Sequence, residues 1–227
     1  MAGTVTLSTL RTLVRQRADM VSGSNGSGGF VSDSELNYYI NAASAELYDI
    51  LVTNYEDQYT EELAFTITSG STADLGGGFL KLVGLDYLDG SDYFEVPRFE
   101  WRERNRRANP STYFQDGVCR DRKYRVVNNT LHIIPTDDAT GTYRLWYVPA
   151  FVDMVSDADA LDAIQVWYEY VVVDAAIRCL AKEESDVSVH MAMKEALKRR
   201  IESAADNRDA NSPQVVRSRW DGYGDGY

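Results

Sequence analysis

Few residues in this sequence could carry catalysis, bind a metal or build a disulfide scaffold. The 227 residues include only two cysteines, Cys119 and Cys179, and two histidines, His132 and His190. Two cysteines so far apart argue against a disulfide framework and favour a reducing compartment. Neither histidine has a second metal-binding residue at ligand spacing. We therefore expect no catalytic residues, no metal, no cofactor and no enzyme activity.

Two motifs typical of ligand binding are also incomplete. The run Gly76–Gly78 is followed by no Lys-Ser/Thr pair and lacks the GxGxxG spacing of a phosphate-binding loop. The acidic run from Asp153 to Asp162 lacks the central Gly and terminal Glu of a calcium-binding loop. We interpret the glycines as a surface loop and the acidic residues as helix caps.

Basic charge and long apolar runs are scarce as well. Lys and Arg number 23 against 35 Asp and Glu, a formal net charge of −12. A chain this acidic is not expected to accumulate on DNA, RNA or anionic lipid, although it could surround nucleic acid without binding it. No window reaches the roughly 18 uncharged apolar residues of a membrane helix. The amphipathic N-terminus with interspersed arginines is unlike a signal peptide, and the sequence is typical of a cytosolic protein.

Apolar residues at helical spacing predict two helices near the N-terminus. The first covers about Leu7–Met20, and the second runs from Ser32 to about Asp57. Ser32 followed by Glu35 is typical of a capping box at the start of the second helix. The expected seam of this helix consists of Leu36, Ile40, Ala43, Leu47, Ile50 and Asn54.

Helical spacing resumes near the C-terminus. A third predicted helix begins at Ser156 or Asp157, with acidic residues in its first turn, and a fourth begins at Ser185. The third is apolar on most faces, so we expect it to be the central buried helix. The expected core residues of these two helices are Ile164, Trp167, Tyr168, Val171, Ala175, Leu180, Val189, Met193, Leu197, Ile201 and Ala204.

Between the two helical regions the spacing of apolar residues changes to two, which is typical of strands. Leu63, Phe65 and Ile67 alternate with other residues, and residues 79–88 are apolar and ambiguous between strand and turn. Further strands are predicted at Tyr93–Val96, Tyr124–Val127, Leu131–Ile134 and Thr142–Val148. Asp89-Gly90 and Asn128-Asn129 predict hairpin turns, residues 69–78 a loop, and residues 97–108 a short helix.

We therefore predict an α+β fold. It consists of a four-helix bundle, with two N-terminal and two C-terminal helices, and a β-rich insert between helices 2 and 3. The expected domains are the bundle over residues 1–60 and 150–205, the insert over 61–149 and an extended C-terminal arm over 206–227.

The segment at residues 98–110 combines arginines with aromatic residues. Its candidate interface residues are Arg98, Trp101, Arg102, Arg104, Arg106 and Arg107. Such a segment can stack on nucleic acid. Its arginines can instead form ion pairs with acids of this chain or of a neighbouring copy, and in a chain at −12 we favour such an interface. Arg208, Arg217 and Arg219 form a further cluster with the same two interpretations.

The last 22 residues, Asp206–Tyr227, cannot build a core. Gly222, Gly224 and Gly226 alternate with other residues, and Pro213 prevents helical continuation. Ordering them costs on the order of 20–40 kcal/mol, whereas each buried aromatic returns at most about 4–6 kcal/mol. We therefore expect a docking arm that orders through main-chain hydrogen bonds on a partner surface. Its expected contact residues are Val215, Val216, Arg217, Arg219, Trp220, Tyr223 and Tyr227.

The order of these motifs resembles the head-to-tail adaptor (connector) proteins of tailed phages. The stretches that carry the resemblance are FVSDSELNYYINAASAELYDILVTNYEDQY, FLKLVGLDYL, FEWRERNR, LWYVPA, VVVDAAIRCLAKEESD and RRIESAADNRD. The resemblance implies a structural virion protein that forms a ring, commonly of about twelve copies, beneath the portal protein. It also implies a helical bundle and a C-terminal arm, here Asn211–Tyr227, that climbs onto the portal ring.

By the same resemblance, the ring links the portal to the tail, and its acidic channel lets DNA pass as cargo. The location implied is the neck of the virion, after assembly in the host cytoplasm, with no membrane partner. The partner of the β insert stays open between a nozzle protein, the tail tube and a neighbouring subunit. Two other functions stay open: head closure or tail-tube attachment in the neck, and nucleic-acid binding through the arginine-rich segment.

Overall fold

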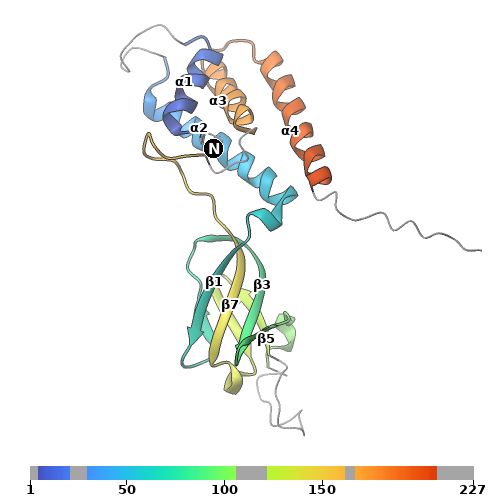
Figure 1. Cartoon of the computed structure of the whole chain (residues 1–227). Helices are drawn as coiled ribbons and strands as arrows, with labels where there is room; N and C mark the ends of the chain where they lie inside the picture. The colour runs from blue at the N-terminus through green and yellow to red at the C-terminus, as the bar shows by residue number, and fades with distance from the viewer. Residues whose placement is uncertain (1–4, 21–29, 106–121, 162–166, 209–227) are drawn as a thin grey trace, which may run out of the picture.

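A computed structural model of the protein describes residues 5–20, 30–105, 122–161 and 167–208, with side chains as far as residue 204. Figure 1 shows a helical part above a β-rich body. The helical part contains α1 (Leu7–Arg17), α2 (Asp33–Asn54), α3 (Tyr168–Lys182) and α4 (Ser188–Arg208). The β-rich body lies between α2 and α3 in the sequence. None of the described helices has the length and apolar character needed to cross a membrane.

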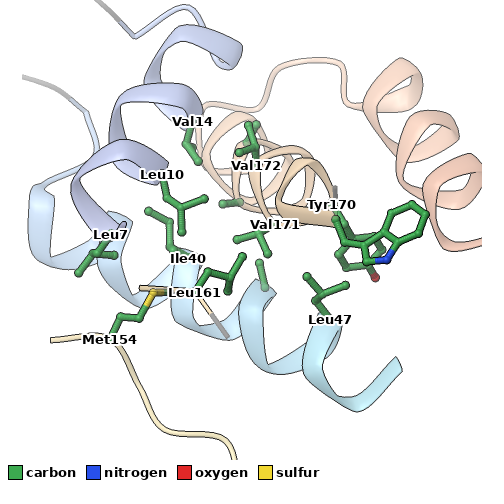
Figure 2. Packing of buried hydrophobic residues seen from close by; sticks show 14 of the residues in the cluster. Leu7, Leu10, Val14, Ile40, Leu47, Met154, Leu161, Tyr170, Val171 and Val172 are labelled. Atoms are coloured by element: carbon green, nitrogen blue, oxygen red, sulfur yellow. The ribbon is translucent and has the colours of Figure 1, made fainter. Parts of the chain in front are cut away.

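The core of the helical part is mainly aliphatic. Leu7, Leu10 and Val14 of α1 lie at helical spacing and are fully buried, because α2 and α3 cover that face. Figure 2 shows Ile40 of α2 and Val171 of α3 in the same cluster. α3 contacts each of the other three helices, as α2 does, and it alone has an unbroken buried run, over residues 170–176, among the described helices. Its predicted central position is therefore confirmed.

The start of α2 follows its predicted capping pattern. The Ser32 hydroxyl accepts a hydrogen bond from the backbone N–H of Glu35 at 3.3 Å. The Glu35 carboxylate pairs with Lys182 of α3 at 2.6 Å and accepts from Tyr39; these contacts, with a weaker one from the Ser32 backbone, lower its pKa. The acid of the capping box thus joins two helices.

The predicted start of the third helix is wrong. Residues 150–161 form an extended strap instead, and α3 is described from Tyr168 onward. The Asp159 carboxylate accepts from the backbone N–H groups of Val155 and Ser156, both at 2.7 Å, and so closes a local turn. Ile164, an expected core residue of this helix, lies outside the described residues.

The predicted core face of α4 is partly wrong. Ile201 is fully buried, and Leu197 and Ala204 pack against the same cluster. Val189 and Met193, which were expected on this face, are 65% and 41% exposed. The apolar face of α4 is therefore wider than the surface that α3 and α2 cover.

Seven strands form two antiparallel sheets within the described residues. The first has the order β1 (Glu61–Ile67), β7 (Gly141–Pro149), β3 (Phe79–Asp89) and β4 (Asp92–Glu95). The second has the order β2 (Thr72–Asp74), β6 (Thr130–Ile134) and β5 (Lys123–Val127). Leu85 and Leu145 of the first sheet share a buried cluster with Leu131 and Ile133 of the second, so the sheets pack face to face.

Most predicted strands agree with the structure to within one or two residues. Both predicted hairpin turns are present, with Asn128 and Gly90 at positive φ of 55° and 66°. The predicted loop at residues 69–78 is wrong in part, because Thr72–Asp74 pairs with β6 as β2. The helix predicted over residues 97–108 is described as one short 3₁₀ turn, Trp101–Glu103.

The predicted fold class is wrong. Four helices are present, but the two antiparallel sheets with their seven strands form a β-rich body and not an insert in a bundle. The two N-terminal helices also differ in length and do not form half of a four-helix bundle. α1 has 11 residues, and the 22-residue α2 leads directly into the β-rich body. The physical reason is that the strands bury a core of their own, separate from that of the helices.

An aromatic cluster joins the two parts. The Tyr48 ring of α2 lies 5.4 Å from that of Tyr59 and 5.8 Å from that of Phe151. The Tyr48 hydroxyl donates to the backbone oxygen of Pro149 at 2.9 Å, and Val148 of β7 is buried in the same cluster. Some of the many tyrosines therefore lie at the junction between helices and sheets.

Candidate interaction surfaces

Arg98, the first predicted interface residue, is held by contacts within the chain. Its Nε donates to the hydroxyl of Tyr124 at 2.9 Å, and Nη2 donates to the backbone oxygen of Leu82 at 2.6 Å. These atoms belong to different sheets, because Leu82 lies in β3 and Tyr124 in β5. The guanidinium therefore links the two sheets.

The residues after Arg98 form a more open surface, which we call the Trp101 surface (Phe99–Arg104). The Trp101 ring stacks on Phe99 with centroids 6.2 Å apart and meets the edge of His132 at 5.4 Å. The Arg104 guanidinium lies 5.3 Å from the Trp101 ring centroid. Arg102 pairs with Glu100, and its side chain is largely exposed. The Trp101 indole thus rests on the buried Phe99, is flanked by two arginines and is partly exposed to solvent.

Several predicted interaction residues lie outside the described residues. These are Arg106 and Arg107 of the arginine-rich segment and the contact residues of the arm, Val215, Val216, Arg217, Arg219, Trp220, Tyr223 and Tyr227. The described chain ends in α4, which leads directly into the predicted arm. The position of the arm therefore depends on how α4 is attached.

A charge network attaches α4 to α2 and α3. Lys194 of α4 donates from Nζ to Asp174 of α3 at 2.8 Å and to Glu46 of α2 at 2.9 Å. Arg178 donates from Nε to the second oxygen of Asp174 at 3.0 Å, and the Tyr170 hydroxyl donates to Glu46 at 2.7 Å. Asp174 is only 3% exposed, so its charge is tolerable because both of its oxygens are paired.

The ionisation of this network follows its hydrogen bonds. Burial alone would raise the pKa of Glu46, but the hydrogen bonds from Lys194 and Tyr170 outweigh it and lower that pKa. Burial alone would lower the pKa of Lys194, but its bonds to Asp174 and Glu46 raise it. Both groups therefore stay charged at neutral pH and hold three helices together.

The residues of the network were missed by the sequence analysis. One signal was available: Asp174 interrupts the apolar run VVVDAAI of a helix expected to be buried. An acid at such a position needs a basic partner from another element. The identity of that partner, Lys194, depends on the packing of α4 and was not readable from spacing.

A second missed cluster lies on the four-stranded sheet. Asp86 of β3 accepts from Arg144 at 3.0 Å and from the Trp146 indole at 2.7 Å, both on β7. The Arg144 guanidinium also lies 3.8 Å from the ring centroid of Tyr93 on β4, and 3.8 Å from Glu62 of β1. One arginine thus ties all four strands together.

The remaining histidine, cysteine and acidic residues that the structure describes are not gathered into one site. No group of three His, Cys, Asp or Glu side chains in the described parts of the chain is placed to hold a metal. Cys179 is fully buried, and this burial raises the pKa of its thiol to about 11, which makes it a poor nucleophile at neutral pH. The His132 ring packs edge-on against the Trp101 ring.

In the described residues, the polar and aromatic clusters hold helices and strands together or lie exposed at the surface. The sequence matches the SU10 adaptor protein family over residues 5–217, and the chain belongs to this family of phage head-to-tail adaptors. Adaptor membership implies interaction with portal and tail proteins and a place in the neck of the virion. No curated protein matches the chain.

Proposed function

We propose that this protein forms a ring below the portal protein of a phage and links it to the tail. The observation that carries the proposal is the family match, which covers residues 5–217 and therefore both the helical part and the β-rich body. The ring, commonly of about twelve copies in the proteins that this chain resembles, would leave a central channel. At −12 per copy the ring is strongly acidic, which favours DNA passage without binding. No enzymatic step is part of this role.

The C-terminal arm, residues 209–227, is the portal-binding element in this proposal. Its support is the attachment of α4, because a helix fixed by Lys194 and Ile201 gives the arm a fixed point of departure. The fifteen residues from Pro213 to Tyr227 can reach about 50 Å if extended. The arm could therefore cross more than one portal subunit.

The Trp101 surface is the second contact in this proposal. An exposed aromatic beside Arg102 and Arg104 is the residue combination favoured at the centre of protein interfaces. In a ring, it would meet acids of a neighbouring subunit or of the tail. The proposed domains, a helical part, a β-rich body and an arm, would then contact different partners.

Deletion of residues 213–227 tests the arm. We expect the truncated protein to lose co-sedimentation with purified portal rings and to keep its helical circular dichroism and melting temperature. The double variant Trp220→Ala/Tyr223→Ala should weaken binding strongly, whereas Ser218→Ala in the same arm should not. Undiminished portal binding by the truncated protein would contradict the arm assignment.

A further inference from the structure

Two valines of the strap (residues 150–161) face solvent. Val152 and Val155 are 80% and 82% exposed, the highest values among the large apolar side chains of the described residues. The strap carries Asp153, Asp157 and Asp159 but no Lys or Arg. Asp157 pairs with Arg11 of α1 and Asp159 accepts from backbone N–H groups, and the exposed Asp153 lies between the two valines in the sequence. Isolated exposed valines are ordinary on a protein surface. Two on one short segment form a small apolar patch.

The exposure of these valines does not come from a loose segment. Asn41 of α2 donates to the backbone oxygen of Met154 at 2.9 Å and accepts from its backbone N–H at 3.0 Å. The Met154 side chain lies in the core beneath, and Asp159 accepts from the N–H of Val155. The strap is thus a fixed edge, and a partner would bind it with little ordering cost.

α4 carries a matching patch of opposite charge. Val189 and Met193 are one helical turn apart and exposed, and Ala192 and Ala196 continue this stripe. Three consecutive basic residues, Lys198, Arg199 and Arg200, follow it. On the helix beyond Lys194 these residues and Arg208 outnumber the acids Glu195, Glu202 and Asp206 by four to three. The α4 patch is therefore apolar at its centre with a basic end, whereas the strap is apolar with an acidic surround.

The two patches lie on opposite sides of the helical part. Figure 1 shows the strap on the left and α4 on the right, with α1, α2 and α3 between them, and Figure 2 shows the same order. A rigid layer of three helices separates the patches, so they cannot meet within one chain. Two complementary surfaces on opposite sides of one subunit produce a head-to-tail contact, which closes into a ring if the rotation allows it.

We propose that the strap of one copy packs against α4 of the next copy. Val152 and Val155 would cover Val189 and Met193, and Asp153 would face the basic end of α4. This arrangement gives the apolar centre and charged rim of a protein interface. The proposal rests on the ring proposed above, and it assigns the surfaces through which neighbouring subunits meet.

A cysteine pair tests the contact directly. In a Cys119→Ser background, Val155→Cys and Met193→Cys in the same chain should give a ladder of disulfide-linked multimers from rings assembled on portal. The matched control replaces Met193→Cys with Glu202→Cys, which is exposed on the same helix but lies about 180° around it at 100° per residue. The control should give at least about tenfold less cross-linked product. Mixing the two single-cysteine proteins should stop the ladder at dimers.

A charge swap provides a second test that does not depend on disulfide formation. Val155→Asp alone should lower the assembled fraction by about tenfold, the effect of 1.4 kcal/mol per contact. Adding Met193→Lys should restore most of the loss, because the two charges meet across the same contact.

The outcomes separate this proposal from the one on which it rests. Rings that still bind portal but give no ladder, together with no rescue by Met193→Lys, would overturn the strap–α4 contact and leave the adaptor ring intact. Cross-links from Val155→Cys to the portal protein would also overturn it. A wild-type protein that never assembles on portal would overturn both proposals.

Discussion

In the helical part, leucine, isoleucine and valine side chains from four helices fill most of the core beside Tyr55, Trp167 and Tyr170, whereas in the β-rich body aromatic rings pack on one another around the buried Tyr143. Phe65 and Tyr87 pack on Tyr143 with ring centroids 5.7 and 5.3 Å away. At its rim, Arg122 lies 3.5 Å from the ring centroid of Tyr87. Apolar contact thus fills both cores, and contacts among rings and guanidinium groups add to it chiefly in the β-rich body.

This difference bears on how each part positions a surface. Apolar packing is non-directional and tolerates small shifts, whereas hydrogen bonds and ring contacts fix orientation. The Trp101 surface needs orientation, and Arg98 supplies it by linking both sheets. In the helical part a comparable device is the network of Asp174 and Lys194, which lies where α4 meets its neighbours. Directional contacts therefore occur beside the surfaces that we propose to bind partners.

The largest expected effect comes from breaking the directional contact of the helical part. Asp174→Ala would leave Lys194 and Arg178, both half-buried, with only Glu46 as an acidic partner. We expect a loss of about 3 kcal/mol in the free energy of unfolding, because two hydrogen bonds between charged groups are lost and each contributes about 1.5–3 kcal/mol. Urea denaturation followed by circular dichroism at 222 nm measures it.

The matched control for Asp174→Ala is Glu195→Ala. Glu195 forms an exposed pair with Arg199 one helical turn away, at 3.2 Å. Exposed pairs of this kind contribute at most about 0.5 kcal/mol. Equal losses in the two variants would mean that the buried network has no special role in holding α4.

A smaller effect is expected from the matching change in the β-rich body. Arg122→Ala removes the ring contact with Tyr87 and the hydrogen bonds to Asp138, at 2.7 Å to its backbone oxygen and 2.9 Å to its carboxylate. We expect a loss of about 2 kcal/mol, because a hydrogen bond to a charged group contributes about 1.5–3 kcal/mol. Near-ultraviolet circular dichroism of the tyrosines follows this part of the molecule.

Arg122→Lys and Arg102→Ala are the controls for this change. The Lys variant keeps the charge but lacks the planar guanidinium, so it should recover less than half of the loss. The largely exposed Arg102 should contribute almost nothing to stability. A full recovery by Lys would show that charge alone, without ring stacking, stabilises this corner.

Patterns that act within a few residues were predictable. The Ser32 cap needs only its own helix start, and the alternation of Leu63, Phe65 and Ile67 needs only its own strand. The helix start predicted at Ser156 or Asp157 was wrong. A Ser followed by acids is typical of a helix start, but here the acid Asp159 closes a turn in the strap. Two explanations of the same residue types compete, and tertiary packing decides between them.

The residue types of the Trp101 surface and of the α4 patch could be predicted from the sequence, but the contacts that each side chain makes could not. The sequence shows arginines beside aromatics at residues 98–104, but not that Arg98 would bind the backbone of Leu82 while Arg102 stays exposed. The stripe of Val189 and Met193 was taken for core because spacing identifies an apolar face without naming what covers it. The three-residue β2 was missed because its pairing with β6 is a long-range contact.

The smallest expected effect is a pH dependence located in the α4 network. Because the pKa of folded Glu46 is lowered from its ordinary value of 4.5, its contribution to stability is complete above that value and is lost as the pH falls below it. Because the pKa of Lys194 is raised from 10.5, its contribution is complete below that value and is lost at higher pH. The network should thus be intact from about pH 5 to pH 10.

Glu46→Gln isolates the acid side of this profile. It keeps the side-chain shape but has no carboxyl to protonate, so its melting temperature should fall less between pH 7 and pH 3 than that of the wild type. Glu195→Gln, at an exposed site on α4, should leave the wild-type profile unchanged. Thermal melts across this range measure the difference. Parallel profiles for wild type and Glu46→Gln would show that the network does not couple α4 to pH and that apolar packing alone positions it.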